Sequence, residues 1–192
     1  IWSLALFLVI LGWQRRLPEL WGAITGPWAG RIAAAALLIS ANWGIFIWAV
    51  QAGHVVQSSL GYYIFPLVAV LLGVVIFHER LGRVQASAVV LAVAAGTLLT
   101  WGLGVAPWIS LGLAVSMGLY GVVKKSLPLG PVLSVAAEVA LLAPFALGWL
   151  LLRGVWQNPG AAPPGFGTSP SMTLLLIFSG VITAIPLVLF SY

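Results

Sequence analysis

One carboxylic acid inside an apolar stretch is the side chain of this sequence best placed to do chemistry. Glu138 ends the string Ser134-Val-Ala-Ala-Glu138, about two turns into the apolar segment 131–152. If this segment spans a membrane, such a group costs at least ~2.5–3.5 kcal/mol at the bilayer centre, so it faces a bundle interior or a cavity and often binds an ion. The competing interpretation is structural, with Glu138 near the cytoplasmic interface and paired with Lys124 or Lys125.

Polar and aromatic residues in other apolar segments form a second set of candidates. Pro66 removes one backbone hydrogen bond from its helix and releases the carbonyl of Tyr62. Bent helices near the middle of a membrane are where transporters often bind substrate, so we expect a cavity near Tyr62, Tyr63 and Pro66, with plain helix curvature as the alternative. Asn42 and Trp43 form another polar point, and Asn42 either contacts substrate or donates a hydrogen bond to a neighbouring helix.

Signatures of enzymes and of metal sites are missing from the sequence. His78-Glu79 lacks the second histidine of a zinc-protease helix, because position 82 is glycine. The chain has no aspartate and no cysteine, which excludes aspartyl dyads, Asp-containing triads and thiolate ligands. We therefore expect no enzymatic activity, no catalytic residue, no metal and no cofactor.

The elements that must position these residues follow from composition. Hydrophobic residues make up 62% of the 192 residues and charged residues 6%, whereas a soluble domain is roughly 25% charged. About 20 apolar residues span a bilayer as a helix, and the apolar runs lack the alternation of barrel strands. The sequence therefore predicts an all-α polytopic membrane protein, a helical bundle with seven hydrophobic segments: 1–13, 31–51, 58–78, 84–103, 107–123, 131–152 and 172–192. Residues 14–30 are predicted to be an interfacial loop, not a dimerising helix.

Basic residues in the loops predict the orientation of these segments. When the loops are numbered alternately, one side carries only Arg153, and the other carries the remaining seven basic residues: Arg15, Arg16, Arg31, Arg80, Arg83, Lys124 and Lys125. The side rich in Lys and Arg is expected to be cytoplasmic. The net charge of +5 therefore reflects topology, and we expect no binding to nucleic acid.

Small residues at helical spacing predict close helix contacts. Ala88, Ala92 and Gly96 share one face of the fourth segment, and Ser110, Ala114 and Gly118 share one face of the fifth. This spacing lets two helix backbones approach each other. Internal packing and a homodimer both remain open as its use.

The sequence also resembles a known family. The resemblance rests on six stretches of sequence: Asn42-Trp43-Gly-Ile-Phe-Ile-Trp48, Leu60-Gly61-Tyr62-Tyr63 followed by Pro66, His78-Glu79-Arg80, Leu119-Tyr120-Gly121-Val-Val-Lys124-Lys125, the predicted helix that contains Glu138, and Ile182-Thr183-Ala-Ile-Pro186. Together they resemble the RarD-type permeases of the EamA branch of the drug/metabolite transporter superfamily. The resemblance covers nearly the whole chain.

The resemblance implies ten helices in two inverted five-helix repeats with both termini in the cytoplasm. The chain would then be a fragment that holds helices two to eight, which fits its lack of an initial methionine and its end within an apolar run. Residues 1–103 would be the first repeat without its first helix, and 104–192 the start of the second. The family implies export or exchange of metabolites and drugs across the plasma membrane, here the bacterial inner membrane, and is associated with chloramphenicol sensitivity.

The leading hypothesis is a secondary transporter, with a non-transporting membrane scaffold or regulator as the alternative. Its partners would be the lipid bilayer and a small-molecule substrate, with proton coupling as a further hypothesis. The substrate cavity is predicted to be lined by Asn42, Trp43, Tyr62, Tyr63, Pro66, Tyr120 and Glu138. Glu138 would bind a proton or cation, and the aromatic residues would form walls for an organic ligand.

Overall fold

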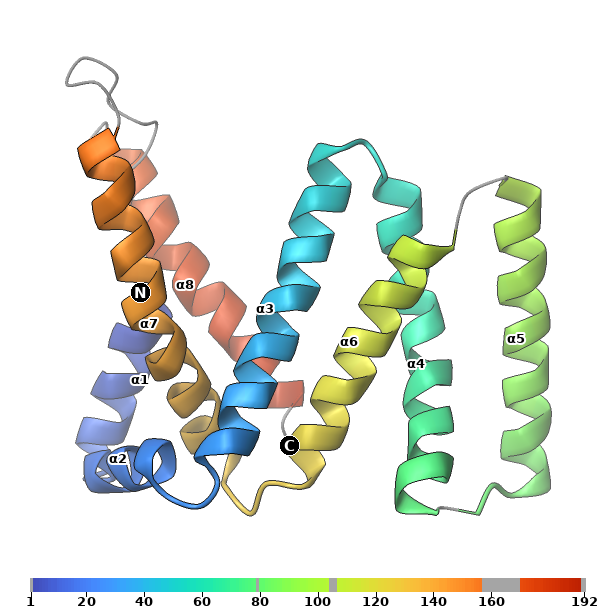
Figure 1. The fold of residues 1–192 in the computed structure, drawn as a ribbon, viewed down its shortest axis with the longest axis horizontal. Helices are drawn as coiled ribbons and strands as arrows, with labels where there is room; N and C mark the ends of the chain where they lie inside the picture. Colours follow the sequence, from blue (N-terminus) through green and yellow to red (C-terminus); the bar gives the residue numbers. More distant parts are fainter. Residues whose placement is uncertain (1, 79, 104–106, 157–169, 191–192) are drawn as a thin grey trace. The chain divides into compact units, whose positions relative to one another are not determined.

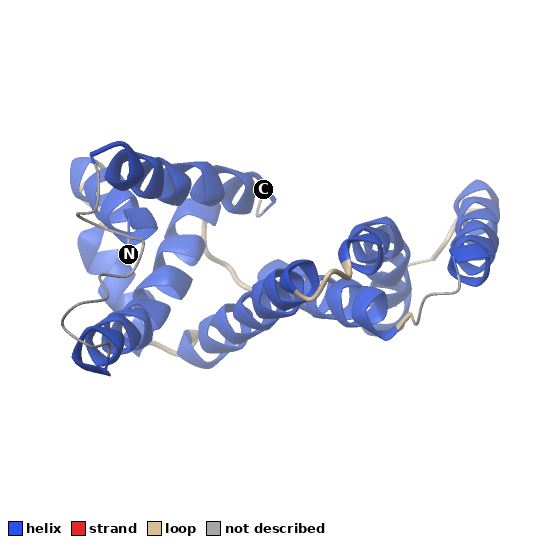
Figure 2. Cartoon of the chain, turned by 90° about the horizontal axis from the view of Figure 1, so that it is seen from above, coloured by secondary structure: helices blue, strands red, loops and turns tan. Residues whose placement is uncertain are grey.

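The computed structural model describes residues 2–78, 80–103, 107–156 and 170–190, and every regular element in these ranges is an α-helix (Figure 2). These residues form eight helices (Figure 1): α1 (Trp2–Trp13), α2 (Leu17–Thr25), α3 (Ala29–Gln51), α4 (Val55–Phe77), α5 (Arg83–Leu103), α6 (Trp108–Lys125), α7 (Pro131–Trp156) and α8 (Pro170–Phe190). The all-α prediction is confirmed, and the seven predicted segments correspond to seven of these helices.

Three helices in the described residues are long and apolar enough to cross a membrane by themselves. They are α3, α4 and the Pro131–Trp149 part of α7. Two shorter apolar helices, Trp2–Trp13 and Arg83–Leu98, add to this pattern. Several helices of this apolarity are stable in a bilayer, because each one satisfies its backbone hydrogen bonds internally. The protein is therefore a multi-pass membrane protein.

The prediction of a loop over residues 14–30 was wrong in part, because helix α2 lies within it. Pro18 stands in the first turn, where a missing N–H costs nothing, and Glu19 is an acidic residue of the same turn. The guanidinium of Arg16 holds both carboxylate oxygens of Glu19, with Nε–Oε1 at 3.0 Å and Nη2–Oε2 at 2.8 Å. This hydrogen bond to Arg16 lowers the pKa of Glu19 below its ordinary value. Leu20 and Ala23 bury the inner face of α2.

Left-handed residues end two of the apolar helices. Gly53, with φ of +80°, follows α3 and lets the chain turn toward α4. His78, with φ of +54°, caps the C-terminal end of α4, and its N–H donates to the carbonyl of Gly73. The turn at Gly53 confirms the short connection that the sequence predicts between the second and third segments. Glu79, in the next connection, lies outside the described residues.

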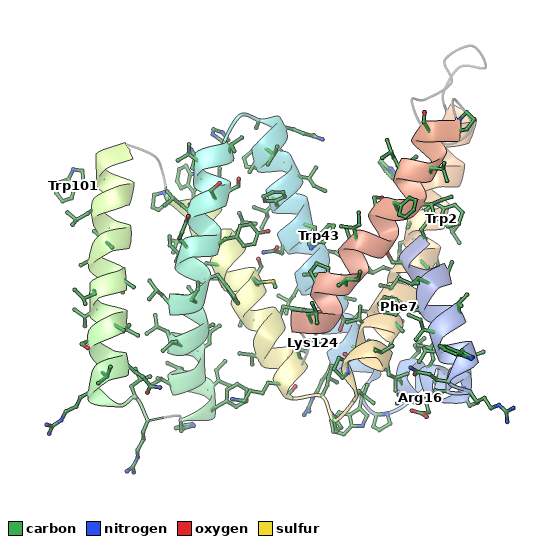
Figure 3. The ribbon with its side chains drawn as sticks, turned by 180° about the vertical axis from the view of Figure 1, so that it is seen from behind. Trp2, Phe7, Arg16, Trp43, Trp101 and Lys124 are labelled. Carbon is green, nitrogen blue, oxygen red and sulfur yellow. The ribbon has the colours of Figure 1, made fainter. Side chains whose placement is uncertain are left out.

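The helices divide into two compact units: residues 1–36 with 127–192, and residues 37–126. In the first unit, α1, α2, the start of α3 and α7 enclose an apolar core in which Phe7 of α1 lies against α7 (Figure 3). Helix α8 crosses α1 where the hydroxyl of Ser3 donates to the carbonyl of Gly180 at 2.9 Å. These units describe packing, so the predicted repeat boundary after residue 103 stays a prediction.

In the second unit, α4 and α6 pack closely through glycines. A Cβ placed on Gly61 would lie 2.8 Å from the Cβ of Leu113, and one on Gly118 would lie 2.9 Å from Leu72 Cδ1. Ser110 and Ala114 are buried on the same face of α6, and Ser110 Oγ donates to the carbonyl of Gln57 at 2.7 Å. The predicted close-contact face of Ser110, Ala114 and Gly118 is therefore confirmed.

The corresponding face of α5 makes no such close contact in the described residues. A Cβ placed on Gly96 would meet no atom within 4 Å, and Ala88 is exposed. Ala88, Ala92 and Gly96 instead line cavities that separate α5 from α4. The predicted close contact at this face is therefore not made with α4, because cavities lie beside these three residues.

Candidate functional site

The polar point at Asn42 is a helix-to-helix hydrogen bond. Asn42 is buried on α3, and its Nδ2 donates to the carbonyl of Leu113 and to Oγ of Ser116, both at 2.9 Å. Ser116 Oγ in turn donates to the same carbonyl at 3.1 Å. Of the two uses left open by the sequence, the structural one is confirmed, because the amide joins α3 to α6. The sequence did not indicate Ser116 as the partner.

The aromatic candidates next to Asn42 expose their rings. Trp43 is 41% exposed, Tyr62 46% and Tyr63 78%. Tyr62 packs edge-to-face against Phe46 of α3, with ring centroids 5.9 Å apart and planes at 69°. Phe46 follows Asn42 by one helical turn, so the two residues together bring α3 against α6 and α4. The sequence reasoning did not single out Phe46, although its spacing of four from Asn42 places it on the same face.

A cavity of about 680 Å³ lies at Pro66, as the sequence predicts for this region. Its lining comes from α4, from α5 and from the connection between them, and includes Arg80 and Gln85. Tyr62 and Tyr63 do not line it. A second cavity of about 610 Å³ continues along the same two helices and ends at Trp101 and the start of α6. The two tyrosines lie about one helical turn before Pro66, so they share its side of α4 but do not line this cavity.

Tyr120 is fully buried near the basic end of α6. Lys124 Nζ lies 5.7 Å from the centroid of the Tyr120 ring, and Lys125 Nζ lies 4.3 Å from that of Phe77, at the end of α4. Cations over aromatic rings are attracted by the negative ring face. These contacts bring the C-terminal ends of α4 and α6 together in the second unit, so the predicted basic side is shared by Lys124, Lys125 and the turn with Arg80. The side chain of Arg153 lies outside the described residues.

Glu138 is buried in the first unit, 2% exposed, within the N-terminal half of α7. Ser134, one turn earlier, donates its hydroxyl to Glu138 Oε1 at 3.3 Å. The flanking residues Ala136 and Ala137 are also buried, in an apolar cluster with Phe7 and Leu11 of α1. A carboxyl group in such surroundings must be hydrogen-bonded or neutral, because an isolated charge loses its hydration there.

The structure places six of the seven predicted site residues in the second unit and Glu138 in the first. Within the second unit, Asn42, Tyr62 and Tyr120 are tied to α6 or to its neighbours by the contacts above. The arrangement offers one buried acid in an apolar core and, separately, exposed aromatic rings around a closely packed α4–α6 pair. Binding of an organic ligand and binding of a proton are the two kinds of chemistry that these groups can support.

Comparison with known proteins matches residues 1–101 to the EamA-like transporter family. The chain belongs to this family. It is also 44% identical to protein RarD of Streptomyces exfoliatus over 99% of its length, and 39% identical to the uncharacterized transporter YojE of Bacillus subtilis over its whole length. Protein RarD of Escherichia coli K12 is 35% identical over the whole chain. The predicted resemblance to RarD-type EamA permeases is confirmed.

The chain spans 59 to 64% of the length of these three relatives. No solved structure matches it. The family that matches is described as a transporter family, and this description is the basis of the proposal below.

Proposed function

We propose that the protein is a secondary transporter that moves small organic metabolites or drugs across the bacterial plasma membrane. Membership of the EamA-like transporter family supports this proposal, as do several helices apolar enough to span a bilayer. The observation that carries it is the burial of Glu138 beside Ser134 in an apolar core. Ionisable residues within membrane spans are typical of ion and substrate pathways.

Glu138 is the proton or cation site in this proposal. Ser134 donates a hydrogen bond to its carboxyl at 3.3 Å, and the apolar cluster of Phe7, Leu11, Ala136 and Ala137 lies in the same unit. Binding and release of a proton or cation at Glu138 would accompany the exchange of two conformations.

The aromatic side chains form the walls of the substrate site. Trp43, Tyr62 and Tyr63 present partly exposed rings, and rings of this kind stack on flat organic molecules. Tyr120 is buried on α6. Pro66 removes one backbone hydrogen bond of α4, between the two tyrosines and the C-terminal end of that helix. Asn42 sets the position of Trp43 through its bonds to α6. Alternating access would come from two inverted repeats, the first ending near residue 103, and the family match over residues 1–101 supports that boundary.

The test is substrate accumulation in proteoliposomes that contain the protein. Compounds are screened under an imposed pH gradient, and chloramphenicol comes first because a relative from Pseudomonas aeruginosa is named chloramphenicol-sensitive protein RarD. Gradient-driven accumulation of any compound above the level in empty vesicles supports the proposal. No accumulation of any compound by correctly inserted protein contradicts it.

A scaffold or regulatory protein is the second candidate, and one observation favours it. Among the described residues, no buried side-chain nitrogen or oxygen lacks a hydrogen-bond partner. A protein built only to hold its helices together would satisfy its polar groups in this way. Water access distinguishes the two: Glu138 in a transporter exchanges protons with the bulk during turnover, and in a scaffold it does not.

A further inference from the structure

Two neighbouring cavities between α4 and α5 in the second unit have Leu67 in common and together make up the α4–α5 groove. The cavity of about 680 Å³ is lined by Leu67, Gln85 and Ala92, and the cavity of about 610 Å³ shares Leu67 and continues to Trp101. From Gln85 to Trp101, α5 rises roughly 24 Å at 1.5 Å per residue. The α4–α5 groove therefore extends over most of a hydrocarbon core of about 30 Å, and Figure 3 shows Trp101 at one end of α5.

The chemistry of the groove differs between its two ends. Along its length the lining is mostly alkyl, with Thr97 near Trp101, and at the end opposite Trp101 it holds Arg80 and the amide of Gln85. Arg83 begins α5 at this same end, and Lys125 lies against Phe77 where α4 ends. Arg80, Arg83 and Lys125 carry three positive charges. The sequence adds one negative charge at Glu79, so this end is net positive. An apolar slot closed by a cationic end matches an anionic head group that carries a hydrocarbon chain.

We propose that the α4–α5 groove binds an anionic phospholipid, with its phosphate at Arg80 and one acyl chain lying along Leu67 and Ala92. Basic pockets between membrane helices on the cytoplasmic side hold anionic head groups, and the distribution of Lys and Arg assigns this end to the cytoplasm. A zwitterionic phospholipid also offers a phosphate to Arg80, but its head group has no net charge to balance the cations at this end. The proposal does not depend on transport.

The experiment measures lipid selectivity with the protein reconstituted in phosphatidylcholine bilayers that contain spin-labelled phosphatidylglycerol or spin-labelled phosphatidylcholine. The quantity is the relative association constant of the two labelled lipids for motionally restricted sites at the protein. Arg80→Gln removes the cation, and Arg80→Lys keeps a point charge. Ala92→Phe fills the slot and leaves every charge unchanged. The matched controls are Arg15→Gln, which removes an exposed cation from another helix end, and Val90→Phe, which enlarges an exposed residue of α5 outside the groove.

We expect wild type to prefer phosphatidylglycerol and Arg80→Gln to lower this preference roughly fivefold, the factor that corresponds to ~1 kcal/mol per arginine at an anionic membrane. Arg80→Lys should retain most of the preference, and Ala92→Phe should remove the restricted site. Both controls should behave as wild type. Equal association of the two lipids with wild type overturns the proposal, as does an unchanged preference in both Arg80→Gln and Ala92→Phe. Displacement of the label by a transported compound would assign the groove to that compound instead.

Discussion

The amide nitrogen of Asn42 lies 2.9 Å from the carbonyl oxygen of Leu113, a residue 71 positions further along the chain. The two atoms join α3 to α6 inside an otherwise apolar contact of Ala49, Ile109 and Leu113. A hydrogen bond between helices in lipid is worth ~0.6–2 kcal/mol. This contact sets where Trp43 and the neighbouring rings stand relative to α6.

Replacing Asn42 by leucine tests this contact. The variant removes the amide donor to the Leu113 carbonyl and to Ser116 Oγ and crowds the space that the amide occupied, so we expect the free energy of unfolding to fall by about 1–3 kcal/mol. Reversible unfolding in mixed micelles measures it. Ser58→Ala is the matched control, because Ser58 is equally buried but bonds only within its own helix, to Val55. Equal losses in the two variants would refute a special role for Asn42.

Substitution of Gly61 tests the close approach of α4 and α6. In Gly61→Ala the new methyl group would lie 2.8 Å from Leu113 Cβ and 3.1 Å from the Ser110 carbonyl, so the helices must separate. We expect a loss of about 1–3 kcal/mol of unfolding free energy. Gly118→Ala should cost less, because its nearest atom is the flexible end of Leu72. Gly44→Ala meets no atom within 4 Å and should stabilise the protein by about 0.5–1 kcal/mol.

The pair of Arg16 and Glu19 gives a prediction about pH. The hydrogen bond from Arg16 lowers the pKa of Glu19, so the pair stabilises α2 above the ordinary pKa of a glutamate and loses its effect as the pH falls through the lowered pKa. The chain has only three acidic residues, so glutamate labelled with ¹³C gives a sparse spectrum for titration. Arg16→Gln should raise the pKa of Glu19 toward its ordinary value. An unchanged titration in that variant would show that the pair does not persist in the membrane-bound protein.

The sequence was sufficient to locate the long helices. Their apolar runs are so long that composition alone marks them, and Gln51, Leu103 and Pro131 are boundaries common to prediction and structure. Helix α2 was missed because three glycines, Gly22, Gly26 and Gly30, stand among Trp21, Pro27 and Trp28, a composition that indicates a loop. The signals that would have found it are Pro18 and Glu19 in the first turn and the spacing of Leu20 and Ala23.

The site could be predicted only as a set of residue types. That Asn42 lies within a helix follows from the sequence, but its acceptor is a backbone carbonyl on another helix, which no local pattern specifies. Likewise, burial of Glu138 follows from its apolar neighbours, whereas its separation into a different compact unit from Asn42 and Tyr62 depends on packing between distant segments. Long-range contacts of this kind depend on the whole fold.

Proton-coupled flux in Glu138→Gln is the most direct measurement of the proposed function. Once a compound is found that accumulates in proteoliposomes, its gradient-driven uptake and the accompanying proton movement are measured for wild type, Glu138→Gln and the control Glu19→Gln, which removes an exposed acid from α2. We predict that Glu138→Gln abolishes accumulation driven by the pH gradient and retains the binding of the compound, while Glu19→Gln behaves as wild type. Unchanged coupled uptake in Glu138→Gln would contradict the assignment of Glu138 as the proton site.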